Sequence, residues 1–541
     1  MTLIGNIPPN NRGIVPGVVY VSLFAFIVLL ISAPLADLSR IHLGPPDRHL
    51  NDQVGYITVA RNLKETGRLY SNIIYPSTLF QVTTKNYLYL PGYYFALAAS
   101  YAFFGFGLLQ SYLPNLLAYL FSAVGLYLIG SKLYSTQTGY AAAALFILFP
   151  VHILYSFSAM SEMTLSFSVI LASSIFFFLP DRWRPYLGAL ALTIPLLFRE
   201  IGVFLIIPFG LLIYQFQKRN LRTTLVFTVL SLVISGVLLS SNVSSGRPSL
   251  LLANIFDDRF ETVYRDALAL SSISPQLGDW IPAISRKMLT NLEFLIYPVK
   301  ALDFSFDLIL FYTILLMMVI LLGAGLRTRD IFLLSAGLFT LSVFIAILSF
   351  YAIFSYRGLR VILFTLPIGF LGSAHLFQNY IARRYFMGEK SLFRFIPAAL
   401  IIGLAVTSLI ATGLMASRFN SMDHIDDKNL AFMEQIGHDD RTLLVSPYEF
   451  SLYYVYTHYP VKYSFVPKNR ETFALLAQRF EIGTLIISQK EYEDFFSRTN
   501  FEQYGLTLQQ TAFYNGEVYL VWRGKPDIQA RLFRQSSLAI P

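Results

Sequence analysis

Ionisable side chains lie at the ends of several long apolar stretches, where a charge is costly unless it has a function. The acids are Asp52, Glu162 and Glu200, and the bases are Lys85, Arg199, Arg357 and Arg360. A guanidinium can bind two phosphate oxygens at once, and a carboxylate can take the proton of a hydroxyl group. Because phosphate leaves as a stable anion without a general acid, the set suits glycosyl transfer from a lipid-linked phosphosugar to a hydroxyl acceptor.

The acid Asp52 lies in residues 51–67, a polar stretch that follows the first long apolar run. Apolar side chains recur there at about helical spacing, which predicts a short amphipathic helix. Its apolar stripe consists of Val54, Ile57, Ala60 and Leu63. Asn51 or Asp52 can cap the start of this helix, and Gly67 suits the left-handed position after its end. Capping does not exclude catalysis, so Asp52 can be a cap, a base or both.

The composition indicates a polytopic membrane protein. Of 541 residues, 55% are hydrophobic and 13% are charged, whereas soluble domains have about 25% charged residues; the mean hydropathy is +0.55. The absence of cysteine excludes disulfides, thiolate metal sites and cysteine nucleophiles. The net charge of +9 suits loops that face anionic lipid. The basic residues are scattered along the chain, so nucleic acid is not an expected partner.

Apolar runs long enough to cross a bilayer, which takes about 17 to 25 residues, recur along much of the chain. They lie at 16–37, 111–131, 138–158, 161–180, 200–217, 222–241, 303–325, 330–352, 359–380 and 394–417. The run 185–198 is of marginal length, and the run 88–108 is apolar but rich in Tyr and Gly. Length alone therefore leaves the number of spans open.

Charge asymmetry decides the topology. If 185–198 crosses the membrane and 88–108 does not, the short basic loops all fall on one side, which the positive-inside rule makes cytoplasmic. These loops hold Arg12, Lys132, Arg182, Arg184, Lys218, Arg219, Arg222, Arg327, Arg329, Arg383 and Arg384. The prediction is eleven spans, with 88–108 as a re-entrant or juxtamembrane helix in the outer leaflet. Loops 38–110 and 242–302, the ionisable set and all residues after 418 then face outward.

The tail from 418 to 541 changes character, because charge rises and long apolar runs stop. Residues 442–446 and 484–488 are predicted to form short buried strands, and 470–481 and 489–497 to form helices. Residues 512–522 predict a β-hairpin, since Asn-Gly at its centre is a strong two-residue turn signal. The tail is therefore expected to be a small α/β domain.

Five short motifs resemble those of membrane-embedded GT-C glycosyltransferases, most closely the branch with protein O-mannosyltransferases and the lipid A aminoarabinose transferase. Residues 52–67 (Asp-Gln-Val-Gly-Tyr, then Ala-Arg and Gly) resemble the Asp-Glu-x-x-Tyr…Ala-Arg…Gly stretch of that family's first outer loop. Residues 90–105 resemble its Pro-Pro-Leu-Tyr-Tyr…Phe-Gly segment, and 158–162 its second outer-loop acid. Residues 198–200 resemble its Thr-Arg-Pro-Glu turn, and 360–367 its Arg-Tyr-x-x-Pro-x-x-Pro stretch. The resemblance is good over about 45–210, loose over 300–380 and absent in the tail.

The resemblance implies a polyprenyl-phosphate-sugar donor and an inverting transfer on the extracytoplasmic face. It implies a catalytic base at Asp52, a second acid at Glu162 and phosphate binding at Arg360. Two residues depart from the family pattern. The Glu that usually follows the Asp is Gln53 here, and the Lys before the first Pro falls at Tyr89, with Lys85 nearby but out of register.

The remaining site predictions assign phosphate contacts to Arg357, Arg199 and Lys85, and acceptor or sugar contacts to Tyr56, Tyr93 and Glu200. Several have plainer alternatives. Glu162 can cap a span, Arg199 and Glu200 can pair in a turn, Arg357 and Arg360 can snorkel to the interface, and Tyr93 can belong to an aromatic interface belt.

A divalent metal stays open as a cofactor. Asp257 and Asp258, in the outward loop 242–302, resemble a metal-binding pair, but two adjacent acids are also common in surface turns. No cluster of His, Asp and Glu has a recognisable metal-ligand spacing in the sequence.

Two other classes of function compete with an enzyme. A transporter or flippase of lipid-linked sugars would place its charges inside the spans and would have two related halves, whereas here the charges lie at span ends and no two-fold pattern is visible. A catalytically inactive scaffold is the other. Within the fold, an oligosaccharyltransferase usually carries Trp-Trp-Asp in a large soluble domain, but the tail has Trp522 followed by Arg523.

The sequence thus predicts an α-helical polytopic membrane protein of the GT-C fold, with a catalytic membrane domain over 1–417 and a soluble extracytoplasmic α/β domain over 418–541. Its expected location is the plasma or inner membrane. Its expected partners are a polyprenyl-phosphate-linked sugar, an acceptor hydroxyl on a lipid, glycan or protein, and the lipid bilayer.

Overall fold

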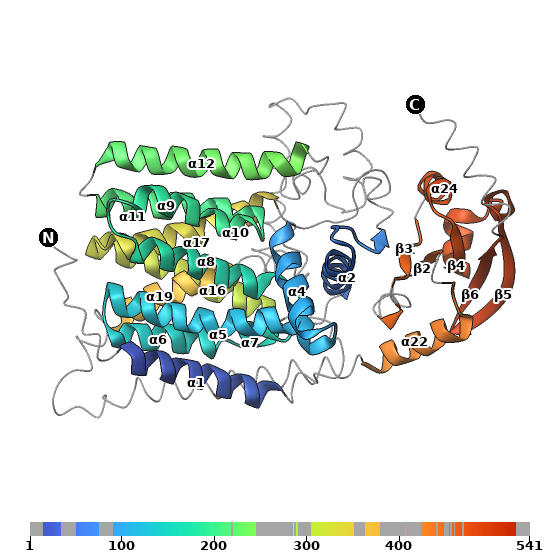
Figure 1. Ribbon diagram of the computed structural model, residues 1–541, viewed down its shortest axis with the longest axis horizontal. Coiled ribbons are helices and arrows are strands. Elements are labelled where there is room, and N and C mark those ends of the chain that lie inside the picture. The colour runs from blue at the N-terminus through green and yellow to red at the C-terminus, as the bar shows by residue number, and fades with distance from the viewer. Residues whose placement is uncertain are drawn as a thin grey trace.

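The computed structural model describes residues 14–33, 50–74, 90–217, 220–244, 305–350, 363–378, 423–439, 442–447, 460–467, 470–514 and 516–525, with a few single positions besides. Long helices run side by side in a bundle, and a smaller unit of strands and helices lies at one end of it (Figure 1). Two further helices, α2 (Leu50–Thr66) and α4 (Pro91–Phe104), lie between the bundle and this unit.

The bundle forms from the apolar runs of the sequence. Its elements are α1 (Ile14–Ser32), α5 (Leu108–Leu133), α6 (Thr136–Ile147), α7 (Pro150–Ser156), α8 (Glu162–Phe178), α9 (Arg184–Ala191), α10 (Thr193–Leu196), η3 (Glu200–Leu205), α11 (Ile206–Phe216), α12 (Leu221–Ser244), α16 (Ser305–Thr328), α17 (Ile331–Phe350), η5 (Leu363–Thr365) and α19 (Leu366–Leu376). Proline shapes some of the breaks. Pro150 begins α7 after a 64° bend from α6, because proline fits the first turn of a helix but not its interior.

Within the described residues, three helices are long and apolar enough to cross a membrane: Ile14–Ser32, Leu108–Leu133 and Leu221–Leu238. The bent pair α6 and α7 passes the same test when taken together. Other predicted spans form shorter apolar helices, among them Glu162–Phe178 and Ile331–Ala346. The predicted span 394–417 lies outside the described residues, apart from helical backbone at 406 and 410.

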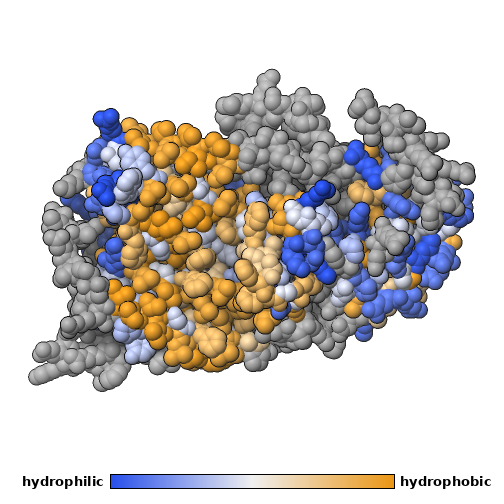
Figure 2. All heavy atoms as spheres, viewed as in Figure 1, coloured by the Kyte–Doolittle hydropathy of each residue, from blue (hydrophilic) through white to orange (hydrophobic). Residues whose placement is uncertain are grey.

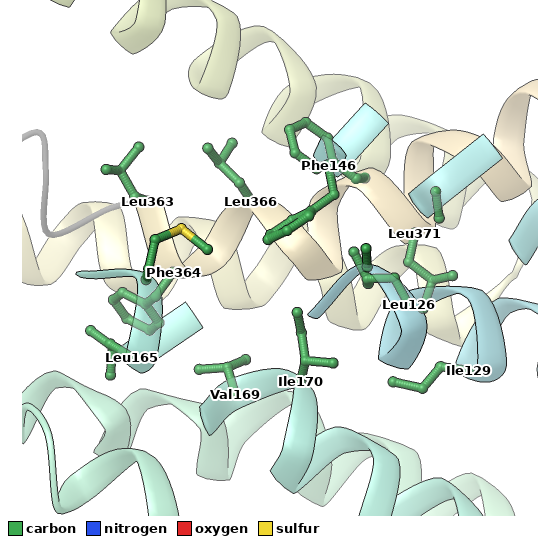
Figure 3. Close-up of a cluster of buried hydrophobic side chains, with 14 of the residues drawn as sticks. Leu126, Ile129, Phe146, Leu165, Val169, Ile170, Leu363, Phe364, Leu366 and Leu371 are labelled. Atoms are coloured by element: carbon green, nitrogen blue, oxygen red, sulfur yellow. The ribbon is translucent and has the colours of Figure 1, made fainter. Parts of the chain in front are cut away.

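The bundle core is built where α5, α6, α8 and α19 meet. Figure 3 shows Leu126 and Ile129 facing Ile170 and Leu371, with Phe146 beside them. Glycine lets two of these helices approach closely, since a Cβ on Gly130 would lie 2.8 Å from Gly139 Cα. In lipid such close packing, more than water exclusion, holds helices together.

On the face shown in Figure 2, hydrophobic side chains cover most of the middle of the bundle, whereas hydrophilic ones predominate on the C-terminal unit. The bundle surface includes large exposed residues of α1 and α12, such as Leu23, Phe26, Leu225 and Val229. A surface of this kind is expected to face lipid, because water would leave it as a large apolar patch.

Helix α2 forms where the apolar periodicity predicted it. Val54, Ile57 and Ala60 are buried, and Gly67 has the predicted left-handed conformation (φ +69°), with its nitrogen donating to the Leu63 carbonyl at 2.9 Å. The predicted cap at Asn51 or Asp52 is wrong. The helix begins at Leu50, so Asn51 and Asp52 lie inside the first turn instead of in front of it.

Helix α4 comes from the run 88–108 and has 14 residues, too few to cross a bilayer. Figure 1 shows it lying across the end of the bundle, the arrangement predicted for a juxtamembrane helix. One side of α4 buries Tyr93, Tyr94 and Leu97, while Phe95 and Phe103 are exposed.

The C-terminal unit contains α22 (Asp423–Ile436), α24 (Arg470–Arg479), α25 (Gln489–Glu491) and the helical turns η8 (Tyr492–Phe496) and η9 (Phe501–Tyr504). Its strands are β2 (Leu443–Ser446), β3 (Lys462–Phe465), β4 (Ile482–Ser488), β5 (Leu506–Tyr514) and β6 (Glu517–Gly524). The predicted strands, helices and hairpin of the tail are confirmed, and Gly516 has a φ of +83° in the hairpin turn. Strand β3 was not predicted.

The sheet also takes a strand from the other end of the chain. Among the described residues its order is β1-β3-β2-β4-β6-β5, and β1 (Ile73–Ile74) pairs in parallel with β3, Ile73 opposite Tyr463. A hydrophobic cluster extends this contact to α2: Val54, Ile57, Ile73, Met433, Tyr463, Ile486 and Val521. Residues 50–74 and the C-terminal unit therefore lie at the same end of the bundle.

This contact predicts that Ile73 stabilises a unit from which it is distant in sequence. Replacing fully buried Ile73 by Ala is expected to cost about 2–5 kcal/mol and to speed amide hydrogen exchange in β3. Leu508→Ala is the control, because Leu508 lies on strand β5 of the same sheet but is half exposed. Unchanged exchange in β3 of the Ile73→Ala protein would show that the β1 contact adds no stability.

Candidate functional site

A buried turn, residues 158–161, joins α7 to α8 at the end of the bundle that carries α2 and α4. All four residues are buried, although the turn connects two helices. Buried backbone groups need partners, and a turn has no regular ladder to supply them. Side chains from α2 and α5 make these contacts.

Asn115 holds the turn from α5. Its Nδ2 donates to the carbonyl oxygens of Ser158 and Met160, both at 2.6 Å, and lies 3.2 Å from the Tyr93 hydroxyl of α4. Because both carbonyls can only accept, they fix the orientation of the amide. One side chain therefore joins the turn, α4 and α5.

Gln53 and Tyr56 hold the same turn from α2. The backbone nitrogen of Ala159 donates to Gln53 Oε1 at 3.0 Å, and the Tyr56 hydroxyl lies 3.0 Å from Ser161 Oγ. Gln53 and Tyr56 are both fully buried. The side chain next to Asp52 is thus attached to the turn that leads to Glu162.

Glu162 begins α8 and pairs with Arg199. Arg199 Nη2 donates to Glu162 Oε1 at 3.3 Å, and Arg199 Nε donates to Ser161 Oγ at the same distance. The side chains are 4% exposed for Glu162 and 11% for Arg199, so water screens this pair weakly. The start of a helix also favours a negative charge, because its free amides point toward it. The structure therefore holds a carboxylate and a guanidinium together in a largely dry site.

Aromatic rings of α2 and α4 pack against one another beside this polar cluster. The Tyr56 ring packs edge-on against Tyr93, with centroids 4.8 Å apart, and also contacts Tyr94. Burial raises the pKa of the Tyr93 hydroxyl well above its usual value. Tyr93 is therefore neutral and can act only through its ring and its hydroxyl hydrogen bonds.

The turn that carries Arg199 is fixed by α4. The nitrogen of Gly92 donates to the Leu197 carbonyl at 2.8 Å, and a Cβ on Gly92 would lie 2.7 Å from that oxygen. Only glycine fits this approach without movement of the backbone.

Replacing Gly92 by Ala is therefore expected to destabilise the chain by about 1–3 kcal/mol, because the methyl group pushes α4 away from the Arg199 turn. Thermal unfolding in detergent measures the effect. Gly236→Ala is the matched control: it lies in helix α12 with nothing within 4 Å of its Cβ position, so alanine should stabilise it. A Gly92→Ala protein as stable as the wild type would contradict the close contact.

The structure brings together four of the residues predicted for the site: Tyr56, Tyr93, Glu162 and Arg199. Glu200 follows directly in η3 and is partly exposed. Asp52 has its backbone in the first turn of α2, beside Gln53, and its side chain lies outside the description. Three predicted phosphate ligands, Lys85, Arg357 and Arg360, also lie outside the described residues.

Sequence reasoning missed Asn115, Ser161 and the contact of Gln53. A signal existed for Asn115, which is an amide near the start of an otherwise apolar span, the kind of residue that tends to be functional in membranes. Gln53 drew attention only as a departure from the family pattern. Its bond to Ala159 joins residues 106 positions apart, and no local pattern predicts such a contact.

The part of the chain that is described holds no group of three or more His, Asp and Glu residues that could bind a metal. Asp257 and Asp258 lie outside that part.

Comparison with solved structures identifies the architecture. The structure of ArnT from Cupriavidus metallidurans bound to undecaprenyl phosphate matches with a TM-score of 0.53 and 13% identity, covering 94% of this chain and 98% of ArnT. The apo form of the same protein matches with a TM-score of 0.50 at 13% identity and the same coverage. The Archaeoglobus fulgidus oligosaccharyltransferase with zinc and sulfate gives 0.49 at 12% identity, covering 93% of this chain and 73% of that one.

No family model and no curated protein sequence matches the chain. The structural likeness nevertheless extends over nearly the whole length of both chains. ArnT has the GT-C fold. The chain therefore has the GT-C fold that its motifs predicted.

Proposed function

We propose that the chain is an inverting glycosyltransferase that moves a sugar from a polyprenyl-phosphate donor to an acceptor hydroxyl. The observation that carries the proposal is the joining of α2, which bears Asp52, to the turn that leads to the buried Glu162 and Arg199 pair. A polar site of this kind at the end of an apolar bundle suits a substrate with a lipid tail and a charged head. The GT-C fold adds support, because ArnT of that fold was solved with undecaprenyl phosphate.

In the proposed reaction, the Asp52 carboxylate takes the proton of the acceptor hydroxyl. The hydroxyl oxygen bonds to the anomeric carbon of the sugar while the bond from that carbon to the phosphate oxygen breaks, which inverts the centre. Polyprenyl phosphate leaves as an anion, so cations replace a general acid. Arg360, with Arg357 and Lys85, would hold this phosphate.

Glu162 would keep Arg199 in place and orient the acceptor. Arg199 would add a positive charge near the leaving phosphate, since a guanidinium binds phosphate oxygens in pairs. Tyr56, Tyr93 and Glu200 would contact the sugar or the acceptor. The residues described supply a charge pair and neutral hydroxyls to this proposed site.

We also infer a topology of eleven spans, with the site and the C-terminal unit on the extracytoplasmic side of the plasma or inner membrane. Its support is the positive-inside rule, which puts the short basic loops of the sequence on one side of the membrane. A reporter fused after 418 is expected to be active only outside the cytoplasm. A cytoplasmic reporter signal would overturn the span count.

Consumption of donor by detergent-solubilised protein tests the function. Purified protein incubated with polyprenyl-phosphate sugars and a membrane extract as the acceptor source is expected to release free polyprenyl phosphate. A flippase would leave the donor intact, because it needs two compartments to act. A folded protein that leaves every donor intact would contradict the proposal.

A further inference from the structure

Side chains from two helices hold every residue of the turn 158–161. Asn115 of α5 donates to the carbonyls of Ser158 and Met160, at 2.6 Å each. From α2, Gln53 accepts from the nitrogen of Ala159 at 3.0 Å, and Tyr56 reaches Ser161 at 3.0 Å. We call Gln53, Tyr56 and Asn115 the turn clamp.

The turn clamp joins the two acids of the proposed site through short stretches of chain. Gln53 directly follows Asp52, and Ala159 lies three residues before Glu162. Gln53 and residues 159–162 are buried, and both stretches begin or end in a helix, so neither can stretch freely. The bond from Ala159 to Gln53 therefore sets how far α2 lies from the start of α8.

We propose that Gln53 is a positioning residue, which fixes the separation of Asp52 and Glu162 through its hydrogen bond to the 158–161 turn. This inference rests on the proposed function, because it assigns those two acids to one reaction. An amide suits the role, since it accepts the bond without adding a third negative charge beside two acids. Gln53 itself touches no reacting atom.

Asn115 supports the interpretation of the turn clamp. Its Oδ1 is buried and accepts no hydrogen bond from the described residues, and an orphan acceptor of this kind lowers stability. An apolar residue of similar size would avoid that loss. The side chain is therefore better explained by the two carbonyls that its nitrogen holds than by packing alone.

Two variants with side chains about as long as glutamine distinguish the effect of the hydrogen bond on activity from the effect of packing. Gln53→Met removes the acceptor and is expected to lower kcat about 10- to 100-fold, because a small misplacement of reacting groups is enough for such a loss. The KM for the donor should change less than about threefold, since none of the proposed phosphate ligands belongs to the turn clamp. Gln53→Glu retains an acceptor oxygen, and burial beside two acids favours its neutral form. It therefore adds no third charge and is expected to keep kcat within about threefold of the wild type.

Thr58→Val is the matched control. Thr58 is buried on the same helix, but among the described residues its hydroxyl donates only to the Gly55 carbonyl within α2, so kcat should stay near the wild-type value. If Gln53→Met does not fold, Asn115→Leu takes its place. Its control is Ser122→Ala, which removes a buried hydroxyl of α5 that has no partner among the described residues.

The possible results distinguish a failure of the positioning role from a failure of the proposed glycosyltransferase activity. Wild-type protein that consumes no donor contradicts the glycosyltransferase itself. Active wild type with a Gln53→Met protein of normal kcat overturns the positioning role. So does a Gln53→Glu protein as slow as Gln53→Met, because the loss would then come from packing and not from the missing acceptor.

Discussion

Replacing Asp52 by Asn is expected to abolish most transfer activity while the chain stays folded. Asn has nearly the same shape but cannot take a proton, and removal of a general base slows a reaction by about 10²- to 10⁴-fold. Asp52 lies in the first turn of α2, where an uncharged polar side chain is well tolerated, so stability should change little. Release of polyprenyl phosphate by purified variant and wild type measures the effect.

A second acid on the same helix provides the control. Glu65 is exposed near the end of α2 and pairs only with its neighbour Lys64 among the contacts described. Glu65→Gln removes the same charge from α2 and should leave turnover unchanged. Near wild-type turnover in a folded Asp52→Asn protein would exclude Asp52 as the base and leave it a residue of the first helical turn.

Local signals in the sequence were sufficient for much of the fold. The spacing of Val54, Ile57 and Ala60 predicted α2, and Gly67 marked its end. Asn-Gly predicted the hairpin of β5 and β6 because only a few residue types fit such a turn. Each of these signals depends on residues a few positions apart, so the chain carries them before any tertiary contact forms.

The contacts that assemble the candidate site were not predictable in this way. Strand β1 has two residues and forms because β3, almost 400 positions later in the chain, offers its edge. Asn115 and Gln53 gain their roles from backbone groups of a distant turn. The sequence could place Glu162 and Arg199 on one side of the membrane through loop charges, but only the fold brings them to 3.3 Å.

The Glu162 and Arg199 pair offers the second large effect, this time on stability. Arg199→Met removes the cation that donates to the buried Glu162 carboxylate, which is expected to cost about 3–5 kcal/mol. Adding Glu162→Gln removes the carboxylate charge as well, so the double variant should regain most of that loss. Thermal unfolding of the wild type, both single variants and the double variant gives the coupling free energy. The exposed pair of Lys64 and Glu65 should show little coupling in the same cycle.

Activity in the same four proteins decides whether the pair is only structural. If Glu162 and Arg199 serve the reaction, the double variant recovers stability but stays inactive, because its neutral residues can neither orient an acceptor nor balance a leaving phosphate. If activity returns together with stability, the pair merely holds the start of α8 against the turn before η3. We expect the double variant to recover stability but not activity. Neutral side chains can replace a buried ion pair in folding, but they cannot supply its charges to the reaction.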